Sequence, residues 1–201
     1  MARRKEVKSI KLHLGCGTVY LDGYINIDAV GELASERPDL VEHNITTIKK
    51  YYKYPFRQNK DNKVCDVKMD ILELSSFKKN SVDEILTVNL IDHMKKDEFI
   101  KALSKWKRML KPNGLLIIDV DDRQKQVESL MEAKKLEEIE WGLRVIYCHH
   151  KNKYDTHWWG YTPKYLKNIL KAEGWKIHWT KKNYIVHDLT PNFQVCASKI
   201  S

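Results

Sequence analysis

The sequence predicts an α/β fold: a Rossmann-like, doubly wound and mostly parallel sheet of about seven strands, with helices on both faces. First, short apolar or alternating segments recur along the 201 residues, with helix-type patterns between several of them. Second, several of these segments end directly in Gly, Asp or Asn, and polar groups at the carboxyl edge of an open α/β sheet are where ligands bind. Third, Leu115–Val120 is almost wholly apolar, as in a central strand covered on both faces. The length fits a single domain over residues 1–201.

The first half of the chain alternates strand patterns with polar stops. We expect strands over Ile10–Leu14, Tyr24–Ile27, Val64–Met69, Val82–Val88 and Leu115–Val120. The first four end at Gly15, Asp28, Asp70 and Asn89. Residues 29–62 have a weak pattern, so we expect short helices and loops there.

Three helices are expected between and after these strands. Phe99, Leu103, Trp106 and Leu110 recur at helical steps, and the Lys-Pro-Asn-Gly run at 111–114 ends that helix. A polar helix is expected over 123–140. Its expected inner face is Val127, Leu130, Met131 and Leu136.

The last third has the clearest helix signals. Thr162 can cap the helix, Pro163 suits its first position, and Gly174 ends it. Leu166, Ile169 and Leu170 are expected to face inward. Two more strands fit Trp175–Thr180 and Phe193–Ala197.

Composition limits the class of protein. The longest apolar stretch is far short of the roughly 20 residues that span a membrane, and the N-terminus has no apolar signal region. The four cysteines, Cys16, Cys65, Cys148 and Cys196, form no CxxC pair, so we expect free thiols, no metal site and a cytoplasmic protein. The net charge of +9 attracts anions, and both a lysine-rich background and a functional basic patch are consistent with it.

Gly15 and Gly17, directly after the first strand, allow the backbone to approach a ligand closely. A tight turn explains the two glycines equally well. Asp28 closes the next strand, and a carboxylate there can accept two hydrogen bonds from ribose hydroxyls.

Longer motifs carry a family resemblance. KLHLGCGTVYLDGYINID (11–28), DILELSSFKKNSVDEILTVNLIDHM (70–94) and WKRMLKPNGLLIIDV (106–120) resemble the successive motifs of class I S-adenosylmethionine-dependent methyltransferases. GYTPKYLKNILKAEGWKI (160–177) resembles, more weakly, the helix and strand that close such domains. The resemblance implies S-adenosylmethionine as cofactor, a cofactor-binding half over 10–120 and an acceptor-side half over 121–201.

The resemblance also implies residue roles. Gly15 and Gly17 would form the loop beside the methionine part of the cofactor, with backbone groups from Leu14 and Cys16. Asp28 would hold the ribose. The remaining cofactor positions are Asp70 and Ile71 at the adenine, Asn89 facing the methionine carboxylate or the substrate, and Leu90 on the covering segment.

The chain departs from the common family pattern in two places. The gap from Gly17 to Asp28 is too short for the usual long helix, so we expect a short turn there, as in a compact subgroup with the pattern LxxGxG...GxxNxD. Many members of that subgroup are linked to cell-surface sugar biosynthesis or are uncharacterised. The segment 29–62 is longer than a simple crossover needs and would form part of the substrate wall.

Candidate acceptor-side residues cluster late in the chain. His157 and His93 are the candidate bases, although a packed or surface imidazole is the usual role of a single histidine. Tyr154, Trp158 and Trp159 could stack on an acceptor, or could be packing residues. Asp119 and Asp121 are expected as polar edge residues near the acceptor rather than as metal ligands.

These observations predict a methyltransferase that acts on an oxygen or nitrogen of a small-molecule or sugar acceptor. The alternatives are a nucleic-acid (RNA) methyltransferase, favoured by the charge, and a non-catalytic methyltransferase-like binding module. A nicotinamide-dependent dehydrogenase is disfavoured because Tyr20 stands where the third glycine of GxGxxG would be. The sequence gives no prediction of oligomeric state.

Overall fold

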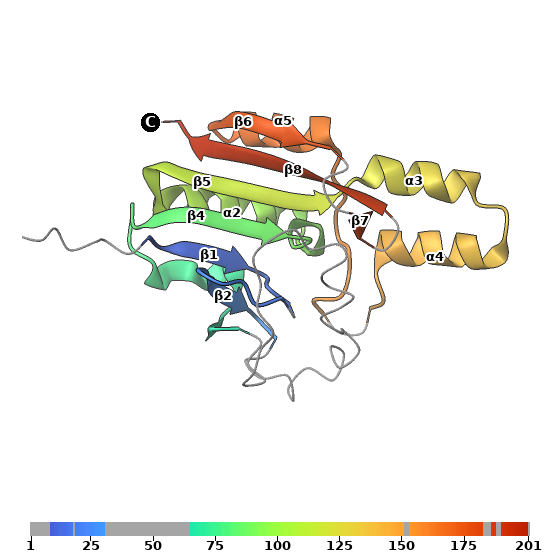
Figure 1. The fold of residues 1–201 in the computed structure, drawn as a ribbon, viewed down its shortest axis with the longest axis horizontal. Coiled ribbons are helices and arrows are strands. Elements are labelled where there is room, and N and C mark those ends of the chain that lie inside the picture. Colours follow the sequence, from blue (N-terminus) through green and yellow to red (C-terminus); the bar gives the residue numbers. More distant parts are fainter. Residues whose placement is uncertain are drawn as a thin grey trace, which may run out of the picture.

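The fold is seen in a computed structural model that describes residues 9–17, 19–30, 65–150, 153–182, 186–187 and 190–200. Its sheet has the strand order β3-β2-β1-β4-β5-β8-β6, and β7 pairs with β8 at the side (Figure 1). β1 to β5 are parallel, and β8 runs antiparallel to both β5 and β6. The strands are β1 (Lys11–Leu14), β2 (Ile25–Asp28), β3 (Val67–Lys68), β4 (Val82–Val88), β5 (Leu110–Asp121), β6 (Trp175–Lys181), β7 (Val186–His187) and β8 (Thr190–Lys199). The predicted mostly parallel α/β sheet is confirmed.

The strand order reverses beside β1, which lies between β2 and β4. In open α/β sheets, ligands bind outside the carboxyl ends of the strands at such a switch point. Leu14 pairs with Thr87, so β1 and β4 end almost level with each other. The segments that follow these two strands are therefore neighbours in space.

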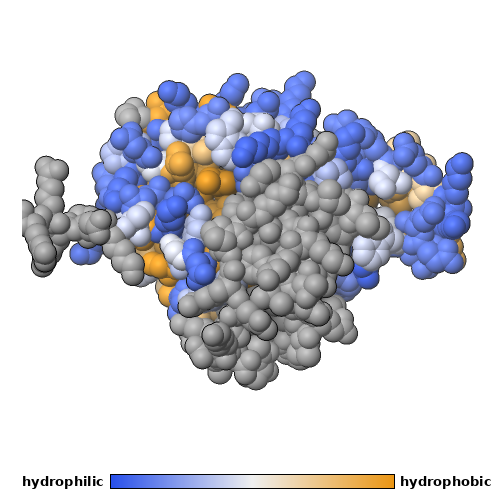
Figure 2. Space-filling model, viewed as in Figure 1, coloured by the Kyte–Doolittle hydropathy of each residue, from blue (hydrophilic) through white to orange (hydrophobic). Residues whose placement is uncertain are grey.

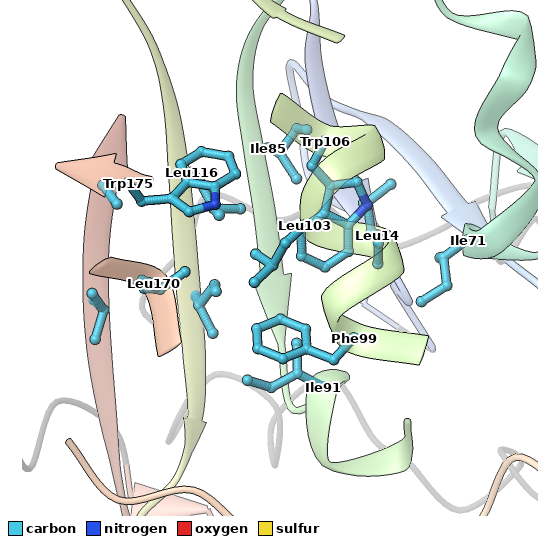
Figure 3. Close-up of a cluster of buried hydrophobic side chains, with 14 of the residues drawn as sticks. Leu14, Ile71, Ile85, Ile91, Phe99, Leu103, Trp106, Leu116, Leu170 and Trp175 are labelled. Atoms are coloured by element: carbon cyan, nitrogen blue, oxygen red, sulfur yellow. The ribbon is translucent and has the colours of Figure 1, made fainter. Parts of the chain in front are cut away.

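One face of the sheet carries the main core. Figure 1 shows α2 (Lys96–Met109) and α5 (Pro163–Ala172) behind the strands, and Figure 3 shows Phe99, Leu103 and Trp106 of α2 within the buried cluster. The cluster also holds Leu116 of β5 and residues of α5. Burial of one such large apolar side chain contributes roughly 1.5–3 kcal/mol, so this face supplies most of the apolar stabilisation of the described residues.

The opposite face of the sheet is more polar. His13, Asn26, Asp119 and Gln194 are all buried, and they alternate along their strands with side chains of the main core. A small cluster that includes Leu86 adds apolar contact there.

Most predicted elements are present, with shifted ends. β3 covers only Val67 and Lys68 of the predicted 64–69 strand, whose first residue lies outside the described ranges. The Lys-Pro-Asn-Gly run does not precede β5 but belongs to it, and the pairing with β4 shifts register between Val82 and Glu84 to accommodate it. Described residues between β1 and β2 form turns rather than a helix, as predicted. The expectation for 29–62 lies almost wholly outside the described residues.

The predicted 123–140 helix is wrong in both extent and orientation. Two helices stand there, α3 (Arg123–Glu132) and α4 (Leu136–Tyr147). Val127, Met131 and Leu136 of the expected inner face are exposed, whereas Gln126 and Val145 are buried. The pattern correctly indicated an apolar stripe, but this stripe does not pack against the sheet.

The last helix confirms its sequence signals. Thr162 Oγ1 accepts the Tyr165 N–H at 3.3 Å, Pro163 opens α5, and Gly174 follows with φ of +71°. Among the described residues, no helix combines the length and the apolar character needed to cross a bilayer.

Candidate cofactor and acceptor site

The loop after β1 is shaped by its two glycines, which have φ of +65° and +54°. The N–H groups of Gly15 and Cys16 donate to the Ile27 carbonyl at 2.9 and 3.1 Å, which fixes the loop to β2. A Cβ on Gly15 would lie 2.4 Å from Leu90 Cδ1, whereas a Cβ on Gly17 would meet no atom of the described residues within 4 Å. A side chain at position 15 would press against Leu90, whereas no described residue fills the space beside position 17.

Asp28 holds this loop from the end of β2. Its Oδ2 accepts the Gly17 N–H at 2.9 Å and its Oδ1 accepts the Val30 N–H at 2.9 Å. The carboxylate is buried. Asp28 thus orders the glycine loop as well as occupying the position expected for a ribose ligand.

The other predicted cofactor residues lie at the same edge of the sheet. Asp70 follows β3 and caps the short helix η3 (Ile71–Ser76) by accepting the Leu72 N–H at 2.9 Å. Ile71 is buried in the main core. Asn89 follows β4 with φ of +45°, and Leu90 covers Gly15. The structure brings these residues to the carboxyl ends of β1 to β4; their cofactor roles stay predictions.

Asn89 is held by a buried amide network. Asn192 Nδ2 donates to Asn89 Oδ1 at 2.7 Å and to Asp119 Oδ1 at 2.8 Å. The Asn89 N–H donates to the Asp119 carbonyl at 2.9 Å. These bonds stabilise a left-handed backbone conformation that few residues other than glycine adopt.

The predicted acceptor-side acids, Asp119 and Asp121, are both buried. Gln194 also donates to Asp119 Oδ2 at 3.3 Å, and Gln126 donates to Asp121 Oδ2 at 2.6 Å. Side-chain amides therefore engage both carboxylates, which act as structural acceptors in this state. A role in acceptor binding stays a prediction.

Both candidate bases lie beside a carboxylate that the sequence did not single out. Asp92 and His93 belong to η4 (Ile91–His93), directly after Leu90. His157 Nε2 lies 3.4 Å from Asp92 Oδ2, and the rings of His93 and His157 meet edge to face with centroids 4.6 Å apart. Among the described residues, neither oxygen of Asp92 nor His93 Nδ1 has a hydrogen-bond partner, although all three atoms are buried. We call Asp92, His93 and His157 the acid–imidazole cluster.

The electrostatics of this cluster favour a charged carboxylate. Burial opposes ionisation of Asp92, but His157, His93 and Arg123 together bring its pKa below the ordinary value. Burial lowers the pKa of His157, and the attraction of Asp92 only partly offsets this. A negative charge therefore lies against two imidazole rings at neutral pH.

His157 differs from the expectation of a free base. Its Nδ1 donates to the carbonyls of Val145 and Ile146 at 3.0 and 3.2 Å, and its Nε2 faces Asp92. Arg123 also donates to Ile146 O, at 2.9 Å. Both groups satisfy carbonyls at the end of α4, which otherwise lack partners. Because both ring nitrogens are engaged, His157 is placed to position its neighbours, and His93 is the better candidate for proton transfer.

The aromatic candidates lie at the surface beside this cluster. The N–H groups of Trp158 and Trp159 donate to the Asp92 carbonyl at 2.8 and 3.2 Å, so the aromatic segment is anchored to η4. Trp158 is 51% exposed, and Lys95 Nζ lies 5.3 Å from the centre of its ring. Tyr154 is also exposed, with Lys153 Nζ 4.7 Å from its ring centre. The arrangement combines accessible rings with cations.

Three side chains of this region could approach a metal ion. His93, Cys148 and His157 place ligand atoms within 4.8 Å of one another. The Cys148 thiol, however, donates to Asp155 Oδ1 at 2.9 Å, and burial together with Asp155 raises its pKa to about 12. This thiol would first have to lose its proton in order to bind a metal ion.

Sequence reasoning missed Asp92 and Arg123. Asp92 lies 65 residues from His157 along the chain, and only the fold brings the two together. One signal was available: Asp92 stands between the apolar Ile91 and His93, in the short segment that follows a strand ending at the ligand edge.

Comparison with known proteins shows the family of the chain. A family model described as a methyltransferase domain matches residues 12–118, just over half of the chain. No curated protein sequence matches this chain.

Solved structures share the fold at low identity. A SAM-dependent methyltransferase from Archaeoglobus fulgidus superposes with a TM-score of 0.56 at 14% identity, covering 96% of this chain and 87% of that one. The Burkholderia thailandensis 1,6-didemethyltoxoflavin-N1-methyltransferase, solved with S-adenosylhomocysteine, gives 0.56 at 14% identity, covering 96% and 72%. The Synechocystis magnesium protoporphyrin IX methyltransferase, also with S-adenosylhomocysteine, gives 0.54 at 12%, covering 96% and 74%. The predicted family, enzyme class and S-adenosylmethionine cofactor are thereby confirmed as properties of the family. The chain belongs to the methyltransferase domain family and has the fold of the class I S-adenosylmethionine-dependent methyltransferases.

Proposed function

We propose that this protein transfers a methyl group from S-adenosylmethionine to an oxygen or nitrogen atom of a small-molecule or sugar acceptor. The observation that carries the proposal is the adjacency of two groups at the end of β4. Leu90 packs on Gly15 of the glycine loop, and the acid–imidazole cluster begins two residues later. A cofactor at the loop and an acceptor at the cluster would be neighbours.

The loop fits the cofactor. No described residue fills the space beside Gly17, and the buried Asp28 carboxylate can accept ribose hydroxyls. When bound, the sulfonium supplies an activated methyl group, so the main task of the protein is to align acceptor and donor. The residues that would hold it are Leu14, Gly15, Cys16, Gly17, Asp28, Asp70, Ile71, Asn89 and Leu90.

His93 would remove the proton that an acceptor hydroxyl or ammonium loses. The Asp92 carboxylate would stabilise the resulting imidazolium, because a charge pair in a buried site is screened weakly. His157 would keep Asp92 and His93 in place from the end of α4. This assigns His93 as the catalytic base and His157 as a positioning residue.

The aromatic segment would bind the acceptor. Exposed rings of Tyr154, Trp158 and Trp159 suit the C–H faces of a sugar or a flat heterocycle, and the lysines beside them suit an acceptor that carries an anionic group. Asp119 and Asp121 would support this wall from the end of β5. The four free cysteines are consistent with a cytoplasmic setting.

The test is methylation of a panel of phenols, amines and sugars, followed by S-adenosylhomocysteine release and by the mass of the acceptor. His93→Ala should lower kcat by about 100-fold or more while S-adenosylmethionine binds as in the wild type. His150→Ala is the matched control, because this imidazole is exposed and its Nε2 bonds the Tyr147 carbonyl. Full activity of His93→Ala would overturn the assignment of the base.

The alternatives are separate outcomes of the same assay. Methylation of RNA without any small-molecule product would support the nucleic-acid alternative. One basic depression is lined by Lys79, Lys107, Arg108 and Lys199, but it lies at the amino ends of β4 and β5, opposite the glycine loop. Cofactor binding without methylation of any acceptor would support a binding module.

A further inference from the structure

The hairpin formed by α3 and α4 carries large apolar side chains that remain exposed. Met131 is 81% exposed, Leu136 67% and Tyr147 57%. Val127, Ile139 and Leu143 are exposed as well. A contiguous apolar patch on a protein surface is more often an interaction site than a face left to solvent.

The exposed residues of α4 form one stripe. Leu136, Ile139, Leu143 and Tyr147 follow one another at steps of three, four and four, which places them on one side of the helix. The side toward α3 is different: a Cβ on Gly142 would lie 2.8 Å from Leu130 Cδ1. Because each residue turns the helix by roughly 100°, this contact is well removed from the stripe. The hairpin thus packs internally and leaves the stripe free.

The outer part of the hairpin, where α3 leads into α4, stands clear of the other described elements. Figure 1 shows α3 and α4 projecting beyond the carboxyl end of β5, away from α2 and α5. Figure 2 shows hydrophobic colour among hydrophilic residues at this end of the molecule. A partner could therefore reach the stripe without displacing any described element.

Charge narrows the kind of partner. Residues 123–147 hold five basic residues (Arg123, Lys125, Lys134, Lys135, Arg144) and five acidic ones (Glu128, Glu132, Glu137, Glu138, Glu140). The hairpin is neutral, so the net charge of +9 lies in the remainder of the chain. Two copies repel each other through that remainder but not through the hairpin, and a polyanion or an anionic membrane would be drawn elsewhere.

The charges beside the stripe favour self-pairing in one direction. Glu137, Glu140 and Arg144 form a row along one flank of the stripe, acidic toward the start of α4 and basic toward its end. We propose that this hairpin pairs with the same hairpin of a second copy, with the two α4 helices antiparallel about a two-fold axis. That arrangement sets Arg144 of one copy against Glu137 of the other, whereas a parallel pairing would oppose like charges.

Sedimentation velocity from low to high micromolar concentration tests the proposal. The wild type should form a concentration-dependent dimer, and Leu143→Glu and Leu136→Glu should both shift it to monomer. Ser129→Glu is the matched control, because it adds the same charge to an exposed position of α3 between Val127 and Met131 but on the other side of the helix. S-adenosylhomocysteine binding should be equal in all four proteins, which shows that each is folded.

A charge exchange tests the direction of pairing. Arg144→Glu and Glu137→Arg should each raise the dimer Kd about tenfold, and the double variant should restore it. A wild type that stays monomeric, or a Leu143→Glu variant that dimerises like the wild type, would overturn the proposal. Binding of the monomer to lipid vesicles through the stripe would do so as well. None of these results depends on whether methyl transfer occurs.

Discussion

Replacement of Asp28 separates its two expected roles. Each carboxylate oxygen accepts one backbone N–H at 2.9 Å inside a buried environment. A hydrogen bond to a charged group contributes about 1.5–3 kcal/mol. Asp28→Ala removes two such bonds, and we expect the free energy of unfolding to fall by about 3 kcal/mol. Asp28→Asn keeps one acceptor oxygen and should lose about half of that.

Cofactor affinity should fall further than the loop alone explains. If the carboxylate also accepts two ribose hydroxyls, Asp28→Ala loses about 3 kcal/mol of binding free energy, or roughly 100-fold in Kd. Calorimetric titration with S-adenosylmethionine and S-adenosylhomocysteine measures this, and urea unfolding measures stability in parallel. Asp22→Ala, at an exposed site in the next turn, is the control. A destabilised Asp28→Ala that still binds with nearly the wild-type Kd would refute the ribose role and leave only the structural one.

Three further predictions concern single positions. Burial lowers the pKa of His13 to about 4, so the unfolded chain binds more protons below pH 6.5. Urea titrations should show about 3 kcal/mol of stability present above pH 6.5 and lost as the pH falls toward 4, and His13→Gln should flatten this slope. Gly17→Ala and the control Gly23→Ala should each lower the free energy of unfolding by about 1–2 kcal/mol, because both positions have a positive φ. Calorimetry should show weaker cofactor binding for Gly17→Ala alone, because only this Cβ enters the space beside the glycine loop. Thr162→Ala should lower stability by about 1 kcal/mol by removing the cap on the Tyr165 N–H, and Thr162→Ser should retain it in the same denaturation assay.

The parts of the fold that follow from local physics were predictable. β4 matches its predicted range because the strand-favouring Ile85–Val88 segment stops at the polar Asn89, and α5 matches because its cap, proline and glycine agree. β3 and β7 have two residues each, which is too short for any periodic signal. Their pairing depends on neighbouring strands rather than on their own residues.

The errors have a common physical cause. Periodicity indicates that one side of a helix is apolar, but it does not indicate which surface covers it. Met131 and Leu136 satisfied the pattern and yet lie outside the core of the described chain. In the same way, the sequence identified His93 and His157 as candidate bases, but the hydrogen bonds that engage Nδ1 of His157 arise only because α4 ends beside it.

The polar second face of the sheet explains how the site is held rigid. Asn26 Oδ1 accepts the Leu21 N–H at 2.9 Å, and its Nδ2 donates to the Leu21 carbonyl at 3.0 Å, which ties the turn after the glycine loop to β2. Asn192 of β8 holds Asn89 through its side chain, because its Nδ2 donates to Asn89 Oδ1 at 2.7 Å. Buried amides can make such bonds in two directions at once, and their loss leaves buried backbone groups unsatisfied at a cost of about 1–3 kcal/mol each. Side chains on the polar face of the sheet therefore stabilise the strands that carry the predicted cofactor residues, without needing to contact a ligand. Substitutions at Asn26 or Asn192 should weaken cofactor binding because the loops that these side chains hold become less ordered. The more the loop backbone is disordered by a substitution, the larger the loss of cofactor affinity should be.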